Sequence, residues 1–215
     1  MIEQPHADVD RASPEGIVDG DAATHLEALI SGVIAPAPHT MGAEGLPIEL
    51  VAEHLRLSGT VLIGRHRRLT DFVNNHTGLI ELHDVTVLHL NGDPTQITSP
   101  SIWVNPEEVT LVGETSDVGR RETAAMEFQP KQTFPVVVVT AGHTLTGELH
   151  LIPEATLAAF MESSSPVWIP MTDVSTRSLA DRRVVSRYGF ALVNRRQIVA
   201  ATELQPGMER GRDLL

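Results

Sequence analysis

Histidine is the first residue type in this chain to consider for chemistry, because imidazole binds metals and transfers protons. The 215-residue sequence contains ten histidines. His83 and His89 lie in a segment that alternates apolar and polar residues, so their rings would share one face of a strand. Metal sites usually bring their ligands closer, such as two histidines at i and i+4 of a helix with a carboxylate nearby. That spacing is absent, and the sequence predicts no metal and no cofactor.

Nucleophilic catalysis has no support in the residue pattern either. The chain has no cysteine, which excludes a thiolate nucleophile, cysteine-bound zinc and disulfides. No serine lies in a Gly-x-Ser-x-Gly turn, and the serines at 163–165 precede a proline, as is typical of a loop. Carboxylates are plentiful, but no pair lies in an apolar segment that would shift a pKa for acid–base work. We therefore predict that the protein is not an enzyme.

Arginines of the C-terminal third form the strongest candidate for anion recognition. A guanidinium group binds phosphate and carboxylate through paired hydrogen bonds. These side chains would contact RNA or an acidic protein segment, or else pair with the acidic N-terminal part of the same chain. The sequence leaves the two roles open and favours internal pairing. The residues concerned are Arg182, Arg183, Arg187, Arg195 and Arg196.

The negative charge of the chain is concentrated near its N-terminus. The formal net charge is −12, and residues 1–55 hold ten acidic residues against one arginine. A field of this sign disfavours non-specific binding to nucleic acid and to anionic membranes. No apolar run approaches the ~20 residues of a membrane span, and residues 1–5 lack the features of a signal peptide. We expect a soluble, cytoplasmic protein.

Two segments, 47–112 and 135–201, carry the same series of turn and packing residues. A repeat of this kind defines the architecture before any single element is assigned. The matched residues lie 88 or 89 positions apart and are those that make turns and cores rather than active sites. They include Pro47 and Pro135, Gly59 and Gly147, Leu69 and Leu157, Phe72 and Phe160, Asp84 and Asp173, and Asn105 and Asn194.

Each copy is predicted to hold about five short strands, with a helical turn after the second strand. Alternation of apolar and polar residues predicts strands at 48–52, 55–63, 79–90 (one strand or two), 102–105 and 109–112, with a helical turn at 68–74. The second copy predicts strands at 136–140, 144–152, 167–174, 184–193 and 197–201, with a helix at 155–162. Short, strongly bent strands favour a small barrel over a sandwich.

An amphipathic helix is predicted at residues 22–34, inside an acidic N-terminal segment that spans residues 1–46. Prolines at 36 and 38 end it. Its apolar face either covers one end of the first barrel or docks onto a partner protein. A polar linker is expected at 113–134 and a polar tail at 202–215. The face consists of Leu26, Leu29, Ile30, Val33 and Ile34.

The run at residues 59–63, followed by 68–74, resembles the signature of an uncharacterised family of small bacterial domains, and residues 147–151 and 157–160 repeat it. The order of features is similar to that of Sm-like barrels: a helix, Gly-x-Val/Leu, Asp and Asn in a turn, Leu-x-Asp-Val and a valine-rich closing hairpin. The resemblance implies two tandem five-stranded barrels of the Sm-like or SH3-like kind.

RNA binding is the activity that the Sm-like resemblance implies, through an Asp and an Asn in one loop and an Arg-Gly in the closing loop. Asp71 and Asn74 match the first loop in copy one, but its closing loop, 105–108, is acidic. The closing loop of copy two, 194–196, holds two arginines, but its first loop has neither Asp nor Asn. Neither copy carries the complete set.

Together these observations predict a mainly β protein with short helices: two tandem five-stranded barrels preceded by an N-terminal helix. We expect a non-catalytic module that binds another protein or assembles with itself. The alternative is nucleic-acid binding through the arginine-rich face of the second copy. An affinity that falls steeply with salt, and that is lost when Arg182 and Arg183 are replaced, would favour the alternative.

Deletion of residues 1–35 is expected to leave the rest of the chain folded but to change oligomeric state or partner binding, because the apolar stripe on 22–34 must be covered by some surface. Light scattering and pull-down of full-length and truncated protein provide the measurement. Identical results for both would show that this helix is not an interaction element.

Overall fold

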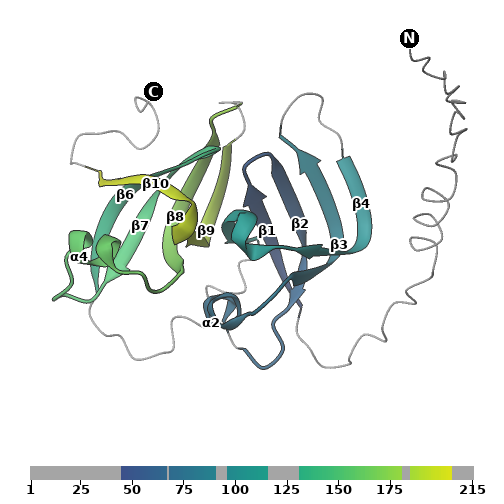
Figure 1. Ribbon diagram of the computed structural model, residues 1–215, viewed down its shortest axis with the longest axis horizontal. Helices are drawn as coiled ribbons and strands as arrows, with labels where there is room; N and C mark the ends of the chain where they lie inside the picture. Colours follow the sequence, from purple (N-terminus) through teal and green to yellow (C-terminus); the bar gives the residue numbers. More distant parts are fainter. Residues whose placement is uncertain (1–44, 67, 91–95, 116–130, 181–184, 205–215) are drawn as a thin grey trace, which may run out of the picture. The chain divides into compact units, whose positions relative to one another are not determined.

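The fold is mainly β, with ten antiparallel strands in one sheet and a few short helices (Figure 1). The computed structural model describes residues 45–66, 68–90, 96–115, 131–180 and 185–204. The predicted helix at 22–34, with its five apolar residues, lies outside these segments, as do Arg182 and Arg183. Within the described segments, no helix is both long and apolar enough to cross a bilayer.

The first half of the sheet begins with a hairpin and a short helix before its longer strands. Its elements are β1 (Gly45–Ala52), β2 (Leu55–Leu62), α2 (Leu69–Asn75), β3 (Ile80–His89), β4 (Gln96–Val104), the 3-10 turn η1 (Pro106–Glu108) and β5 (Val109–Glu114). The second half runs through β6 (Gln132–Thr140), β7 (His143–Leu151), α4 (Leu157–Glu162), β8 (Trp168–Ser178), β9 (Val185–Asn194), the turn η3 (Arg195–Gln197) and β10 (Ile198–Glu203).

Both halves follow one strand order. The full order is β10-β6-β7-β8-β9-β5-β1-β2-β3-β4, so each half reads fifth, first, second, third, fourth strand. The sheet is open and ends at β4 and β10, whereas the sequence predicted two tandem five-stranded barrels. The pairing that joins the halves, β9 with β5, is a long-range contact that no local pattern in the sequence encodes.

Corresponding bends occur at matched positions of the two halves. Gly59 and Gly147 lie where the register shifts between the second and third strands, between Ser58 and Thr60 and again between Thr146 and Glu148. A Cβ on Gly59 would come within 2.9 Å of the His83 carbonyl oxygen, so a side chain there must displace backbone. A glycine inside a strand pattern is typical of a bulge or sharp bend, and the register shifts show one in each half.

Two aspartates bend the third strand of each half in the same way. Asp84 has a φ of 51° and Asp173 a φ of 49°, in the left-handed region that Asp and Asn tolerate better than bulkier residues. Each is followed by a buried valine, Val85 or Val174. The Asp-Val pair matched in the sequence thus marks a backbone turn followed by a core residue.

Two hydrophobic cores lie on opposite faces of the strands that join the halves. Val112 and Leu192 belong to the first core, whereas Leu111 and Val193, their neighbours in sequence, belong to the second. Successive side chains of a strand point to opposite faces, so the β5–β9 pair forms a wall shared by both cores. Each core therefore contains buried residues of both halves.

Replacement of Gly59 by valine is expected to lower the free energy of unfolding by about 1–3 kcal/mol, because the new Cβ meets the backbone of β3. Thr60→Val on the same strand is the matched control and should change stability little. Urea titration followed by circular dichroism measures both. Equal midpoints for the glycine variant and wild type would contradict the close approach.

Candidate functional site

The contact between the two halves is a short strand pairing with a large apolar anchor. Leu111 pairs with Val193, Val112 with Leu192 and Gly113 with Ala191. Three pairs are few for a stable strand contact, so side chains must supply most of the stabilisation.

Trp168 and Leu192, at the start of β8 and the end of β9, supply the anchor. Both are buried, at 4% and 0% exposure, and both belong to the core of the first half. The Trp168 backbone N–H donates to Asn74 Oδ1 at 3.1 Å, and Asn74 Nδ2 donates to the Trp168 carbonyl at 3.3 Å. The second half thus inserts two apolar side chains into the first half, and α2 holds the tryptophan backbone in place.

Asn194 fixes the polar end of the same contact. Its buried side chain donates to the carbonyl oxygens of Pro106 at 3.2 Å and Val109 at 2.9 Å, and its Oδ1 accepts from Arg196 N–H at 3.0 Å. A buried amide whose donors and acceptor are all used stabilises one register over others. Beside it, Arg196 and Glu107 form an exposed ion pair of 2.6 Å.

Tyr188 belongs to the second core, on the face of the β5–β9 pair opposite to Trp168 and Leu192. Its ring lies close to Gly113. Its hydroxyl donates to Glu49. A Cβ on Gly113 would come within 2.3 Å of the tyrosine ring, so only glycine fits there. Burial, followed by the hydrogen bond to Glu49, raises the pKa of Tyr188, which keeps the hydroxyl a donor.

The residues that correspond to this buried anchor are exposed, one on β4 and one directly before β3. Trp103 lies 89 residues before Leu192 and is 59% exposed, and Leu79 lies 89 residues before Trp168 and is 50% exposed. The strand pairings agree with this match, since Glu81 pairs with Trp103 as Pro170 pairs with Leu192. Among the described residues no strand pairs with the outer edge of β4. Trp103 is exposed there, whereas Ile102 and Val104 pack against the first core.

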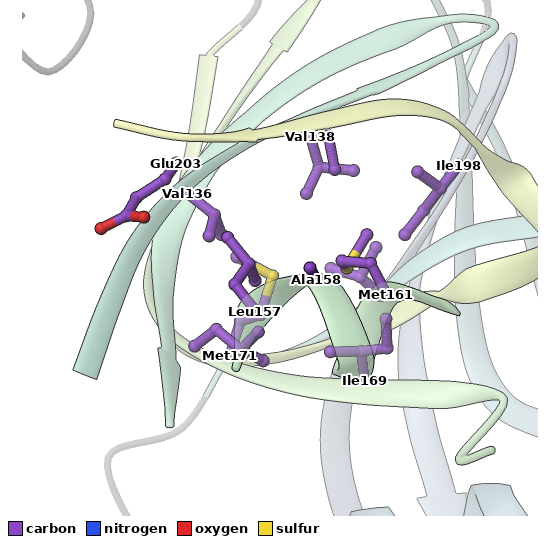
Figure 2. Close-up of a pocket in the computed structure, with 12 residues that line it drawn as sticks. Val136, Val138, Leu157, Ala158, Met161, Ile169, Met171, Ile198 and Glu203 are labelled. Atoms are coloured by element: carbon purple, nitrogen blue, oxygen red, sulfur yellow. The ribbon is translucent and has the colours of Figure 1, made fainter. Parts of the chain in front are cut away.

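A pocket of about 360 Å³ opens in the second half, between α4, β8 and the edge strand β10. Figure 2 shows side chains from β6, α4, β8 and β10 converging on it, with the Glu203 carboxylate at the rim and turned outward. Its walls are apolar apart from this one carboxylate. The lining residues are Val136, Val138, Leu149, Leu157, Ala158, Met161, Ile169, Met171, Val193, Ile198, Ala201 and Glu203.

The described arginines of the predicted anion site, Arg187, Arg195 and Arg196, differ in their surroundings. Arg195 donates to the carbonyls of Pro166 and Phe160, both at 3.0 Å, and lies over the Phe160 ring at 4.7 Å. Burial lowers the pKa of Arg195. Arg196 pairs with Glu107, and Arg187 is exposed on β9. Arg195 is therefore held by contacts within the chain, whereas Arg187 and Arg196 are exposed.

The histidines are spread over several parts of the described structure. No group of three or more His, Cys, Asp or Glu within the described residues is arranged to hold a metal ion. His150 Nε2 lies 2.7 Å from the Thr172 hydroxyl, and His143 is buried at the start of β7. Burial, with a smaller contribution from Arg56, lowers the pKa of His143 to about 4, so it is neutral at physiological pH.

No protein-family model, curated protein or solved structure matches this chain. The sequence did not predict the pocket or the exposure of Trp103, although one signal was present. Each half carries one tryptophan: Trp168 is part of the anchor, and Trp103 is at the position that corresponds to Leu192, the other anchor residue.

Trp168→Ala is expected to lower the free energy of unfolding by about 3–5 kcal/mol, because it leaves a cavity in the first core. Trp103→Ala removes the same side chain from an exposed position and is the matched control. In dilute solution it should change stability by less than about 0.5 kcal/mol. Urea unfolding measures both, and equal losses would contradict the assignment of Trp168 as the anchor.

Proposed function

We propose that this protein is a non-catalytic assembly module, made of two Sm-like five-stranded units in tandem, that binds protein through the two unpaired edges of its sheet. The common strand order of the halves supports the tandem arrangement. The matched bends at Gly59 and Gly147 and at Asp84 and Asp173 support it as well.

The observation that carries the proposal is the apolar character of the β4 edge. An unpaired edge offers backbone N–H and C=O groups to another strand, and stable monomers blunt such edges with proline or charge. Pro100 does so in the middle of β4, but Ile102, Trp103 and Val104 follow it without any charged residue. Added strands gain affinity from main-chain hydrogen bonds and specificity from pockets for their side chains.

A small apolar ligand is the other occupant that a pocket of this size would accept. The first half argues against it. The corresponding space there is filled by Trp168 and Leu192, side chains of a neighbouring strand pair rather than a ligand. The pocket also lacks the convergent polar groups that orient small molecules.

Nucleic-acid binding, the alternative from the sequence, stays a prediction. Two of its five arginines, Arg195 and Arg196, contact protein groups, and no specific observation favours it.

Protein association of full-length wild type is to be compared with that of Trp103→Glu/Ala201→Glu, which places a charge on each edge. Ile152→Glu is the control, since Ile152 is 50% exposed but lies on neither edge. We expect the double variant to lose self-association and bound proteins in light scattering and pull-down, while the control keeps both. Retention of both by the double variant would show that the edges are not the binding surfaces.

A further inference from the structure

We infer that the partner of these edges is a second copy of this chain, bound head to tail. The β4 edge of one copy pairs with β10 of the next, and Trp103 and Leu79 enter the pocket of the second half. This inference rests on the proposed function and specifies which protein the edges bind.

The pocket matches, position by position, the part of the first core that receives the anchor. Ile48, Leu50, Val61, Leu69 and Ile80 of the first core correspond to Val136, Val138, Leu149, Leu157 and Ile169 of the pocket. In the first half this surface is covered by one tryptophan and one leucine from the neighbouring strands. In the second half the corresponding side chains line a pocket among the described residues (Figure 2). Trp103 on β4 and Leu79, which directly precedes β3, are exposed at the places that correspond to Leu192 and Trp168.

A second pair of neighbouring residues also fits the same contact, because a large residue beside a glycine inside the chain corresponds to two residues of moderate size at the edges. Inside the chain, Tyr188 needs a glycine at position 113. At the corresponding positions, 89 residues away, the edges carry Ser99 and Thr202. The small serine leaves room for the threonine, so β4 and β10 avoid the clash that any side chain on residue 113 would cause with Tyr188.

Polar and charged groups are also complementary between copies. Asn105 corresponds to the buried Asn194, its Oδ1 accepts from Glu107 N–H at 3.1 Å in the same way, and it is exposed. In the head-to-tail contact its amide donates to the carbonyls of Arg195 and Ile198 in the next copy. Glu107 and Arg196 occupy corresponding turns, so each new contact again sets a carboxylate against a guanidinium.

The register follows from the internal contact. It pairs Val104 with Ala200, Trp103 with Ala201 and Ile102 with Thr202, the residues that correspond to the three pairs between β9 and β5. Pro100 lies outside this stretch, at the position of Gly189, so its missing N–H costs no hydrogen bond in the contact. The two edges are different surfaces, so the contact is heterologous and repeats into a ring or a filament.

A mixing experiment with full-length variants tests this arrangement. Trp103→Glu blocks only the β4 edge, and Ala201→Glu blocks only the pocket side. The net charge of −12 per copy requires at least about 0.15 M salt to limit repulsion. We expect wild type to form species larger than a dimer in light scattering. Each variant alone should be monomeric, and an equal mixture should form a 1:1 dimer and nothing larger.

A cysteine pair tests the register, since the chain has no cysteine of its own. Ile102→Cys/Thr202→Cys places two thiols opposite each other across copies, at a Cα separation that a disulfide spans. We expect oxidation to give a ladder of covalent multimers on a non-reducing gel. Ser101→Cys/Thr202→Cys is the control, because a shift by one residue turns the thiols to opposite faces and should give no ladder.

The inference is overturned by three results. One is a dimer formed by either single variant alone, which would mean that like edges meet. Another is a wild-type monomer at all concentrations that still binds a different protein through the edges. In both of these cases the proposed function stands. If wild type binds neither itself nor any protein, the inference and the proposed function fall together.

Discussion

The pairing of β5 with β9 is the contact on which the rest of the structure depends. It places a wall of two strands between two cores, and each strand gives alternate side chains to either side. Val51 and Leu111 of the first half are thereby buried in the second core, and Trp168 and Leu192 of the second half in the first. Each half of about 65 residues would bury too little apolar surface alone, and the shared wall removes that limit.

The two halves form the same apolar surface, but it is covered by side chains in only one of them. The surface formed by the first, second and third strands and the short helix is filled in the first half and open in the second. Trp103 on β4 and Leu79 directly before β3 are exposed side chains of the kinds that fill it. Apolar surface of this sort is uncommon on a monomer unless it serves a contact. A single geometric rule, fourth strand against fifth strand, accounts for the filled surface, the open surface and the exposed edge.

Much of the architecture could be read from the sequence, because the two copies share their turn residues. The strand positions of β1–β3 and β6–β9, both short helices and the bends at Gly59 and Gly147 follow from local patterns. The first residues of β4 were missed, since they are mostly exposed and give no alternation. The β5–β9 wall was missed because both strands are buried on two faces where they meet, and a continuous apolar run does not indicate its partner. The pocket is a property of that pairing and could not be predicted without it.

Because β5 and β9 belong to one chain, their contact forms at any dilution. Bringing them together costs a loop closure, which grows only slowly with the length of the connecting segment. The same contact between separate molecules would also lose translational and rotational freedom, at a cost of about 4–15 kcal/mol. Covalent linkage therefore keeps the β5–β9 contact formed at concentrations at which a contact between outer edges dissociates. It also fixes the two halves in equal numbers. Any closed or open array built from this chain contains an even number of five-stranded units.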